Sequence, residues 1–99
     1  MKCKSKMTEK AIEKKMQKMV CGRGGLTRKF VSPNAPGVPD RIVITPAGVV
    51  WFVELKTISG RLTPLQKHEI AEFEKRNANV RVLYGWDAAR EFIEGVMGK

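Results

Sequence analysis

Residues 49–56, with the sequence Val-Val-Trp-Phe-Val-Glu-Leu-Lys, constrain the fold more than any other part of the chain. An unbroken run of β-branched and aromatic residues predicts a strand, and the lack of polar alternation predicts a central strand covered on both faces. A turn at Pro46-Ala47-Gly48 separates this run from a second apolar run over residues 41–45. The two runs are therefore expected to pair as an antiparallel hairpin.

Apolar periodicity predicts a helix near each end of the chain. The first is capped by Thr8 and runs to about residue 20 or 21, where three closely spaced glycines end it. The last is capped by Asp87 and runs through residue 96. Their inward-facing residues are predicted to be Ile12, Met16, Met19 and Val20 in the first helix, and Ala88 or Ala89, Phe92 and Val96 in the last.

A third helix and two further strands complete the predicted order. Thr63, Pro64 and Gln66 have the spacing of a capping box, which predicts a helix to about residue 77. Strands are predicted over 26–31 and 79–84, and three prolines exclude a helix from the loop between 32 and 39. The buried residues of the third helix are predicted to include Leu65, Ile70 and Phe73. The resulting order is α-β-β-β-α-β-α.

The length of the chain, 99 residues, indicates a single domain. We expect this domain to span residues 8–99, behind a flexible basic segment over 1–7. No apolar run approaches the roughly 20 residues of a membrane span, and the lysine-rich start lacks the apolar core of a signal peptide. The protein is therefore expected to be cytoplasmic.

Positive charge is concentrated at the N-terminal end. The chain has 19 basic and 10 acidic residues, a net charge of +9, of which residues 1–29 contribute +8 (ten basic, two acidic) and residues 30–99 contribute +1 (nine basic, eight acidic). A one-sided positive field favours a polyanionic partner, most often nucleic acid. A solvated lysine face is the alternative interpretation.

Cysteine and histidine chemistry is excluded by the composition. Cys3 and Cys21 have no metal-ligand or redox spacing, and Cys21 is expected to be buried or half-buried. His68 is the only histidine, which argues against a structural zinc site and against a histidine-based triad.

The candidate chemistry resides in Asp40, Glu54 and Lys56. Glu54 and Lys56 lie two positions apart on the predicted central strand and so share one face. Asp40 lies six positions before Pro46, and Glu54 six positions after Gly48, so a tight hairpin brings the two carboxylates together. Such groups at the end of an apolar strand are costly unless they are paired or bind an ion.

Phosphodiester hydrolysis provides a reason for this arrangement. Two carboxylates hold a hard divalent cation through oxygen, and a neighbouring lysine orients or deprotonates a water molecule or stabilises the charge of the transition state. A structural salt bridge of Lys56 with Glu54 or Asp40 is the alternative interpretation, and charge spacing alone favours it.

Three motifs follow one another along the chain: Gly37-Val38-Pro39-Asp40, then Glu54-Leu55-Lys56 on the next strand, then Gln66 at the start of the following helix. This ordered set resembles the VRR-Nuc (virus-type replication-repair nuclease) domain of the PD-(D/E)xK nuclease superfamily, in its stand-alone phage or bacterial form. A glutamate-bearing first helix and the basic strand at Lys29-Phe30 extend the resemblance to about residues 8–92. It implies a restriction-endonuclease-like α/β (α+β) fold, a mixed β-sheet flanked by helices.

The resemblance also implies a role for each matching residue. Asp40 and Glu54 match the metal-binding acids of the family, and the backbone carbonyl of Leu55 matches a further metal ligand. Lys56 matches the catalytic lysine, and Gln66 the helix glutamine near the site. The implied cofactor is Mg²⁺ or Mn²⁺, and the implied activity is that of an endodeoxyribonuclease.

A glutamate on the first helix also belongs to the family pattern. Glu9 and Glu13 both qualify because their i,i+4 spacing puts them on one helix face. Glu9 is favoured because it follows Thr8 at the helix start, although an acid there also complements the helix dipole. Gln66 likewise has an alternative role in the capping box with Thr63.

The resemblance implies DNA as substrate. Four basic residues around the site are candidate phosphate contacts, and each could equally be solvated: Lys29, Arg28, Arg41 and Arg61. Stand-alone members are associated with DNA repair and with homodimers that cut branched DNA such as Holliday junctions. The expected location is the cytoplasm of a bacterial or phage-infected host cell. The apolar residues considered for a dimer contact are Met16, Met19, Trp86 and Met97, which could equally fill the core.

Two other function classes fit the same sequence. A catalytically silent nucleic-acid-binding module on the same fold would bind DNA without cutting it, but has no need for the complete set of acids and lysine. A basic interaction protein, with its lysine-rich first helix against an acidic partner, would have no affinity for divalent ions. Cleavage assays with and without Mg²⁺ or Mn²⁺ separate the three classes.

Overall fold

A computed structural model of the chain describes residues 7–97. It contains a four-stranded mixed sheet with the strand order β1-β2-β3-β4, in which β2 is antiparallel to both β1 and β3, and β4 is parallel to β3. The strands are β1 (Leu26–Lys29), β2 (Arg41–Ile44), β3 (Val50–Lys56) and β4 (Val80–Tyr84). The predicted element order and the central position of the 50–56 strand are confirmed.

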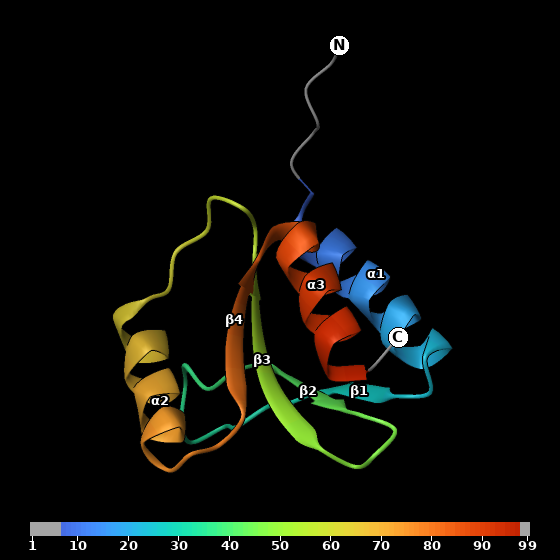
Figure 1. Ribbon diagram of the computed structural model, residues 1–99. Coiled ribbons are helices and arrows are strands. Elements are labelled where there is room, and N and C mark those ends of the chain that lie inside the picture. The colour runs from blue at the N-terminus through green and yellow to red at the C-terminus, as the bar shows by residue number, and fades with distance from the viewer. Residues whose placement is uncertain (1–6, 98–99) are drawn as a thin grey trace.

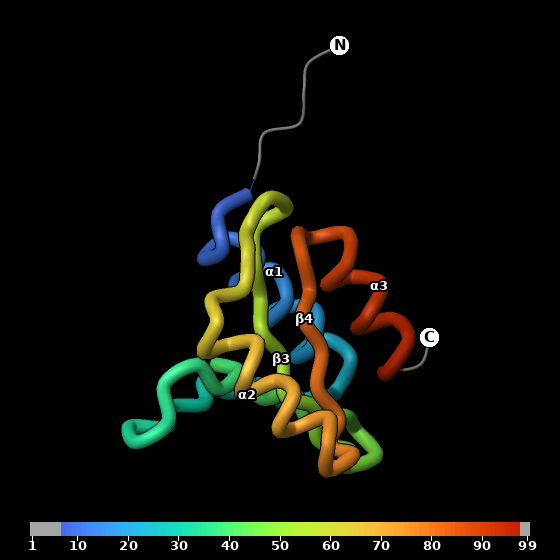
Figure 2. Tube along the Cα trace, turned by 90° about the vertical axis from the view of Figure 1, so that its left-hand side faces the viewer, coloured from blue at the N-terminus to red at the C-terminus, as the bar shows by residue number. Residues whose placement is uncertain are grey.

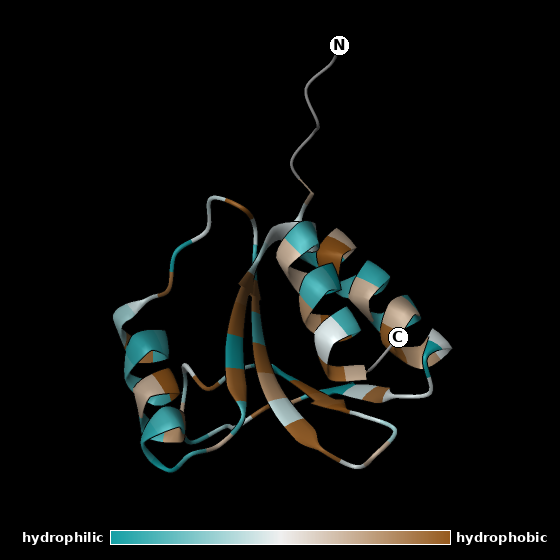
Figure 3. Cartoon of the chain, in the orientation of Figure 1, coloured by the Kyte–Doolittle hydropathy of each residue, from teal (hydrophilic) through white to brown (hydrophobic). Residues whose placement is uncertain are grey.

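Helices cover the two faces of the sheet unequally. The helices α1 (Glu9–Gly22) and α3 (Gly85–Met97) lie side by side on one face, and α2 (Pro64–Lys75) lies alone on the other, as Figures 1 and 2 show. The main core forms between β3, β4 and the α1–α3 pair, and Figure 3 shows the apolar residues that run along both strands. Its fully buried members include Ile12, Met16, Val43, Val53 and Ile93. The alternation of β3 therefore sends Val53 and Leu55 into this core and Glu54 and Lys56 toward the α2 face.

The predicted starts of α1 and α2 are confirmed in atomic detail. The Thr8 hydroxyl accepts a hydrogen bond from the Ala11 N–H at 3.1 Å. Thr63 and Gln66 form a complete capping box, with bonds of 3.1 and 2.9 Å. The end of α2 comes two residues earlier than predicted, at Lys75, because Asn77 adopts a left-handed conformation (φ 62°) that no helix continues through.

Further element boundaries differ from the prediction, and three of them lie next to functional candidates or change a predicted cap. β1 ends at Lys29 rather than at residue 31, although the Phe30 N–H still donates to the Asp40 carbonyl at 2.8 Å. β3 begins at Val50 rather than at residue 49. α3 begins at Gly85 rather than after a cap at Asp87, because the positive φ of Gly85 (85°) turns the chain directly from β4 into the helix.

Several burial predictions are wrong. Leu65, in the first turn of α2, is 55% exposed, and Cys21 is exposed on the outer side of α1. Trp86 is part of α3, and the Lys15 ammonium lies over its ring, 5.0 Å from the ring centroid. Cys3 lies outside the described residues.

The residues first considered for a dimer contact belong to the core. Met16 is fully buried, and Met19, Trp86 and Met97 pack against the core cluster. Met7, placed by the sequence in the flexible N-terminal segment, also packs against this cluster. In the part of the chain that the structure describes, no helix is both long and apolar enough to cross a membrane.

Candidate active site

The β2–β3 hairpin brings the two candidate carboxylates together. Its register pairs Arg41 with Val53, so that Asp40, one residue earlier, faces Glu54, one residue later. The Asp40 backbone N–H donates a hydrogen bond to the Glu54 carboxylate. Asp40 itself is exposed, whereas Glu54 is only 4% exposed. The site therefore combines one carboxylate open to solvent with one inside the fold.

Lys56 and Gln66 complete the surroundings of Glu54. The Lys56 ammonium lies 3.9 Å from Oε2 of Glu54, and its side chain is 13% exposed. The Gln66 amide Nε2 donates to the same Oε2 at 3.3 Å, while Oε1 of Gln66 accepts the capping bond from Thr63. The structural role and the site role of Gln66 thus coexist, because the two ends of one amide point in opposite directions.

The electrostatics of Glu54 distinguish it from an ordinary salt-bridged acid. Burial, followed by the nearby charge of Asp40, raises the pKa of Glu54 from its ordinary value of 4.5 to about 7. Glu9 raises it further, while Lys56 and the Asp40 N–H act in the opposite direction. Negative charge at this position is therefore under-compensated by the protein itself.

The raised pKa makes the stability of the metal-free protein depend on pH. Because folded Glu54 keeps its proton to higher pH than in the unfolded chain, stability is expected to fall as pH rises from about 4.5 to about 7. The shift corresponds to about 3 kcal/mol of unfolding free energy. Urea unfolding in EDTA across this range should show the fall, and the Glu54→Gln variant should lose it; the same pH dependence in both proteins would contradict this account.

Two glutamates of α1 approach the site and have different surroundings. Glu9 and Glu13 line an acidic hollow of about 290 Å³ together with Lys10, Lys29, Asp40 and Leu55. Glu13 forms ion pairs with Arg41 and, at 3.6 Å, with Lys29. Partial burial opposes ionisation of Glu13, but these cations outweigh it and lower its pKa. Glu9 acts on Glu54 through its charge, so the geometry places Glu9 rather than Glu13 as the available acid.

Arg41 lies inside the fold and not at the surface. Only 4% of the residue is exposed, and its guanidinium pairs with Glu13 and donates to the Thr27 hydroxyl at 3.3 Å. The pair ties α1 to β1 and β2 and so positions both Glu9 and Asp40. The alternation of β2, in which Arg41 shares a face with buried Val43, was the sequence signal for this inward direction. We therefore remove Arg41 from the set of phosphate contacts.

The loop before Asp40 is held by a glycine. Gly37 has a φ of 95°, and a Cβ at this position would lie 2.8 Å from the Leu65 backbone carbonyl group. The loop over 32–39 can thus approach the start of α2 closely only with glycine here. Pro39, which directly precedes Asp40 in the motif, is fully buried. This packing aligns Asp40 with the end of β3.

The other basic candidates remain at the surface. Arg28, Lys29 and Arg61 are exposed, and Lys29 borders the acidic hollow. Arg28 also donates to the Thr27 carbonyl at 2.8 Å. Lys10, which borders the same hollow, was not singled out in the sequence because nothing distinguishes it from the other lysines of α1.

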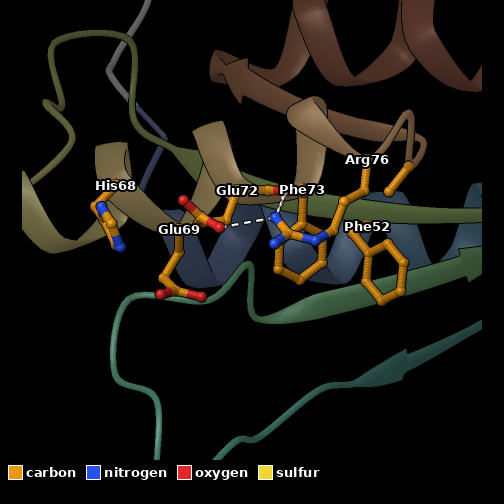
Figure 4. Close-up of a pocket in the computed structure, with 7 residues that line it drawn as sticks. Phe52, His68, Glu69, Glu72, Phe73 and Arg76 are labelled. Atoms are coloured by element: carbon orange, nitrogen blue, oxygen red, sulfur yellow. Dashed lines mark hydrogen bonds and ion pairs between the residues drawn. The ribbon is translucent and has the colours of Figure 1, made fainter.

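A larger hollow of about 600 Å³, shown in Figure 4, lies along the other side of α2. Phe52 and Phe73 form its apolar wall, and their rings meet edge to face at 4.9 Å. Arg76 is held by Glu72 at 2.7 Å, and His68 points away from this pair.

Comparisons with known proteins point to one family. The sequence matches the VRR-NUC domain family over residues 2–87. It is 42% identical over 79 residues to "Putative nuclease p44" of Acyrthosiphon pisum secondary endosymbiont phage 1, across 80% of this chain and 85% of that protein. A solved structure described as "VRR_NUC domain" superposes with a TM-score of 0.81 at 37% identity, covering 89% of this chain and 97% of the other.

Proposed function

This chain belongs to the VRR-NUC family of nucleases, and from that premise we propose that it is a metal-dependent DNA endonuclease centred on Asp40, Glu54 and Lys56. One observation carries the proposal. A buried carboxylate, Glu54, stands at the end of an apolar strand beside a second carboxylate and a lysine, and its charge is under-compensated. A fold gains nothing from this arrangement unless a cation joins it.

The donor set fits a hard divalent cation. Asp40 and Glu54 would hold Mg²⁺ or Mn²⁺ through carboxylate oxygens. Leu55, whose backbone carbonyl would be the further ligand, lines the acidic hollow. Among residues 7–97, no three Asp, Glu, His or Cys side chains are close enough to form a metal cage by themselves. When bound, the ion would polarise the scissile phosphate and neutralise charge.

Lys56 and Gln66 prepare the site for a phosphate. The Lys56 ammonium, 3.9 Å from Glu54, can orient a water molecule or stabilise negative charge that develops on the phosphate. Gln66 donates to the Glu54 oxygen and limits the rotation of that carboxylate. Since Gln66 is anchored by its capping bond, both groups are positioned before substrate arrives.

Exposed cations support DNA as the substrate. Lys29 and Lys10 border the acidic hollow, and Arg28 and Arg61 are exposed. Contacts of this kind to the phosphate backbone are independent of base sequence and make binding sensitive to salt. We assign these four residues to the DNA surface.

We further propose that the protein is a homodimer and that it prefers branched DNA. Two copies related by a two-fold axis would present two sites to a symmetric four-way junction. Leu26, Val49 and Val50 lie together at one end of β1–β3 and are 42%, 43% and 39% exposed, so they offer an apolar contact to a second copy. Light scattering in moderate salt measures the mass directly.

The proposal is tested by incubating the protein with plasmid, duplex and four-way junction DNA in Mg²⁺, Mn²⁺ or EDTA. Cleavage is expected with either metal and not in EDTA. Binding without cleavage under every condition would identify a silent module. Absence of both would leave the basic interaction protein as the better interpretation.

A further inference from the structure

A second polar hollow lies on the far side of Lys56 from the carboxylates. It has a volume of about 390 Å³ and occupies the space between the loop over 57–63, the start of α2 and the end of β4. We name it the tyrosine hollow, and its lining residues are Ile58, Gly60, Arg61, Leu62, Lys67 and Tyr84. None of the candidate metal ligands lines it.

Strand register places this hollow next to the proposed catalytic lysine. β3 and β4 are parallel, and Lys56 pairs directly with Tyr84. Paired residues of neighbouring strands point to the same face, so both side chains lie on the α2 face with Glu54. Across the sheet, Asp40 thus lies directly before β2, Glu54 and Lys56 lie on β3, and Tyr84 lies on β4. Neighbouring strands are roughly 4.8 Å apart.

The groups in the tyrosine hollow lack partners of their own. In the part of the chain that the structure describes, neither Arg61 nor Lys67 forms an ion pair or a side-chain hydrogen bond, and both are exposed. Other surface cations do have partners; Arg76 and Lys75, for example, pair with Glu72. Tyr84, the single tyrosine of the chain, is 37% exposed there.

The walls of the hollow are firmly built. Gly85, with a φ of 85°, turns the chain from β4 into α3 directly beneath Ile58, and a Cβ added to it would lie 3.1 Å from the Ile58 Cδ1. The loop over 57–63 is therefore seated on the β4–α3 junction. At its other end the capping box of Thr63 and Gln66 fixes the start of α2, which places Lys67. The backbone segments that carry the tyrosine, the apolar wall and the two cations are thus fixed relative to one another.

We propose that the tyrosine hollow binds one unstacked nucleotide of the DNA strand next to the scissile phosphate, with its base against Tyr84 and its phosphate between Arg61 and Lys67. This inference rests on the proposed nuclease function and specifies its substrate. An aromatic ring with neighbouring cations is the chemistry that recognises single-stranded nucleotides. A base within a continuous duplex is stacked on its neighbours and does not reach the ring. The hollow therefore selects DNA that is unpaired, or easily unpaired, beside the cleaved bond.

Variants of Tyr84 test the proposal through binding of DNA in EDTA, where no cleavage interferes. Tyr84→Leu is expected to weaken binding of a flap or single-stranded oligonucleotide by about 5- to 150-fold, the range of one base–aromatic contact. Binding of a continuous duplex should change less than twofold. Tyr84→Phe keeps the ring and should bind like the wild type. A 2-aminopurine placed next to the cleaved bond should lose fluorescence on wild-type protein but not on Tyr84→Leu.

A matched pair of charge variants tests the phosphate contact. Arg61→Gln with Lys67→Gln should weaken flap binding and lower its salt dependence by about one phosphate contact. Lys75→Gln with Arg76→Gln removes the same charge from the far end of α2 and should leave the flap preference unchanged. Thermal unfolding shows whether each variant remains folded.

The possible outcomes separate this inference from the nuclease proposal. If the wild type cuts DNA with metal but Tyr84→Leu binds flaps and duplexes as the wild type does, the hollow is not a nucleotide site. An equal loss on flaps and duplexes would also overturn it. If the wild type binds flaps through Tyr84 but never cuts them, the nucleotide site stands and the catalytic proposal fails.

Discussion

Replacing Glu54 by Gln, or Asp40 by Asn, is expected to reduce divalent-dependent cleavage by about 10³-fold or more while DNA binding in EDTA changes little. Each substitution removes one anionic oxygen donor and keeps the size of the side chain. The two variants should differ in stability. Glu54→Gln removes a buried, under-compensated charge and should stabilise the metal-free protein at pH 8, whereas Asp40 is exposed and its replacement should have a smaller effect. Cleavage rates, unfolding and DNA affinity measure the three quantities.

Matched controls exist on α3. Asp87 is exposed and lies in the first turn of that helix, and Glu91 is exposed one turn later. Asp87→Asn and Glu91→Gln make the same chemical changes on a different face and should cleave at the wild-type rate. Wild-type cleavage by Glu54→Gln would refute the site assignment, and a parallel loss in the controls would indicate a general effect of net charge.

Lys56→Ala is expected to lower the cleavage rate by about 10²- to 10⁴-fold with little change in DNA affinity, because the ammonium acts on the water molecule or on the transition state. Its removal also takes away a cation that lowers the pKa of Glu54, so this pKa should rise further in the metal-free variant. Calorimetric Mn²⁺ titration should show that metal binding persists. Cleavage against pH gives the second readout.

The alternative role of Lys56 as a structural ion-pair partner predicts a different pattern. Loss of the pair would then lower thermal stability without affecting the rate per folded molecule. Lys56→Arg distinguishes the two roles, since it keeps the positive charge but cannot act as a base at ordinary pH. If Lys56→Arg keeps the ion pair with Glu54 and the stability of the wild type but cleaves DNA slowly, the chemical role of Lys56 is supported.

The local structure of this chain could be read from its sequence with few errors. The apolar run that ends in Glu54-Leu55-Lys56, the caps at Thr8 and Thr63 and the turn at 46–48 specify their elements through short-range contacts. The meeting of Asp40 and Glu54 also followed from sequence, because a tight turn sets the register of a hairpin. The ordered motifs resemble those of a known nuclease family, and this resemblance predicted the class of enzyme.

Contacts between distant segments required the tertiary structure. The sequence favoured Glu9 over Glu13 only by its place after Thr8, since both lie on one face of α1. The pairing of Glu13 with Arg41, 28 residues further along the chain, appears only in the folded structure. Leu65 and Cys21 were expected to be buried but are exposed, because burial depends on which neighbouring element covers each side of a helix.

Tyr84 was not singled out in the sequence for the same reason. It lies on a different strand from Lys56, and only the parallel pairing of β3 with β4, across the α2 connection, makes the two side chains neighbours. The sequence by itself therefore determined the strands, the helix caps and the motif residues, which depend on local geometry. Only the folded chain decided which acid is free, which arginine is buried and which tyrosine stands beside the lysine, because those depend on packing between elements far apart in sequence.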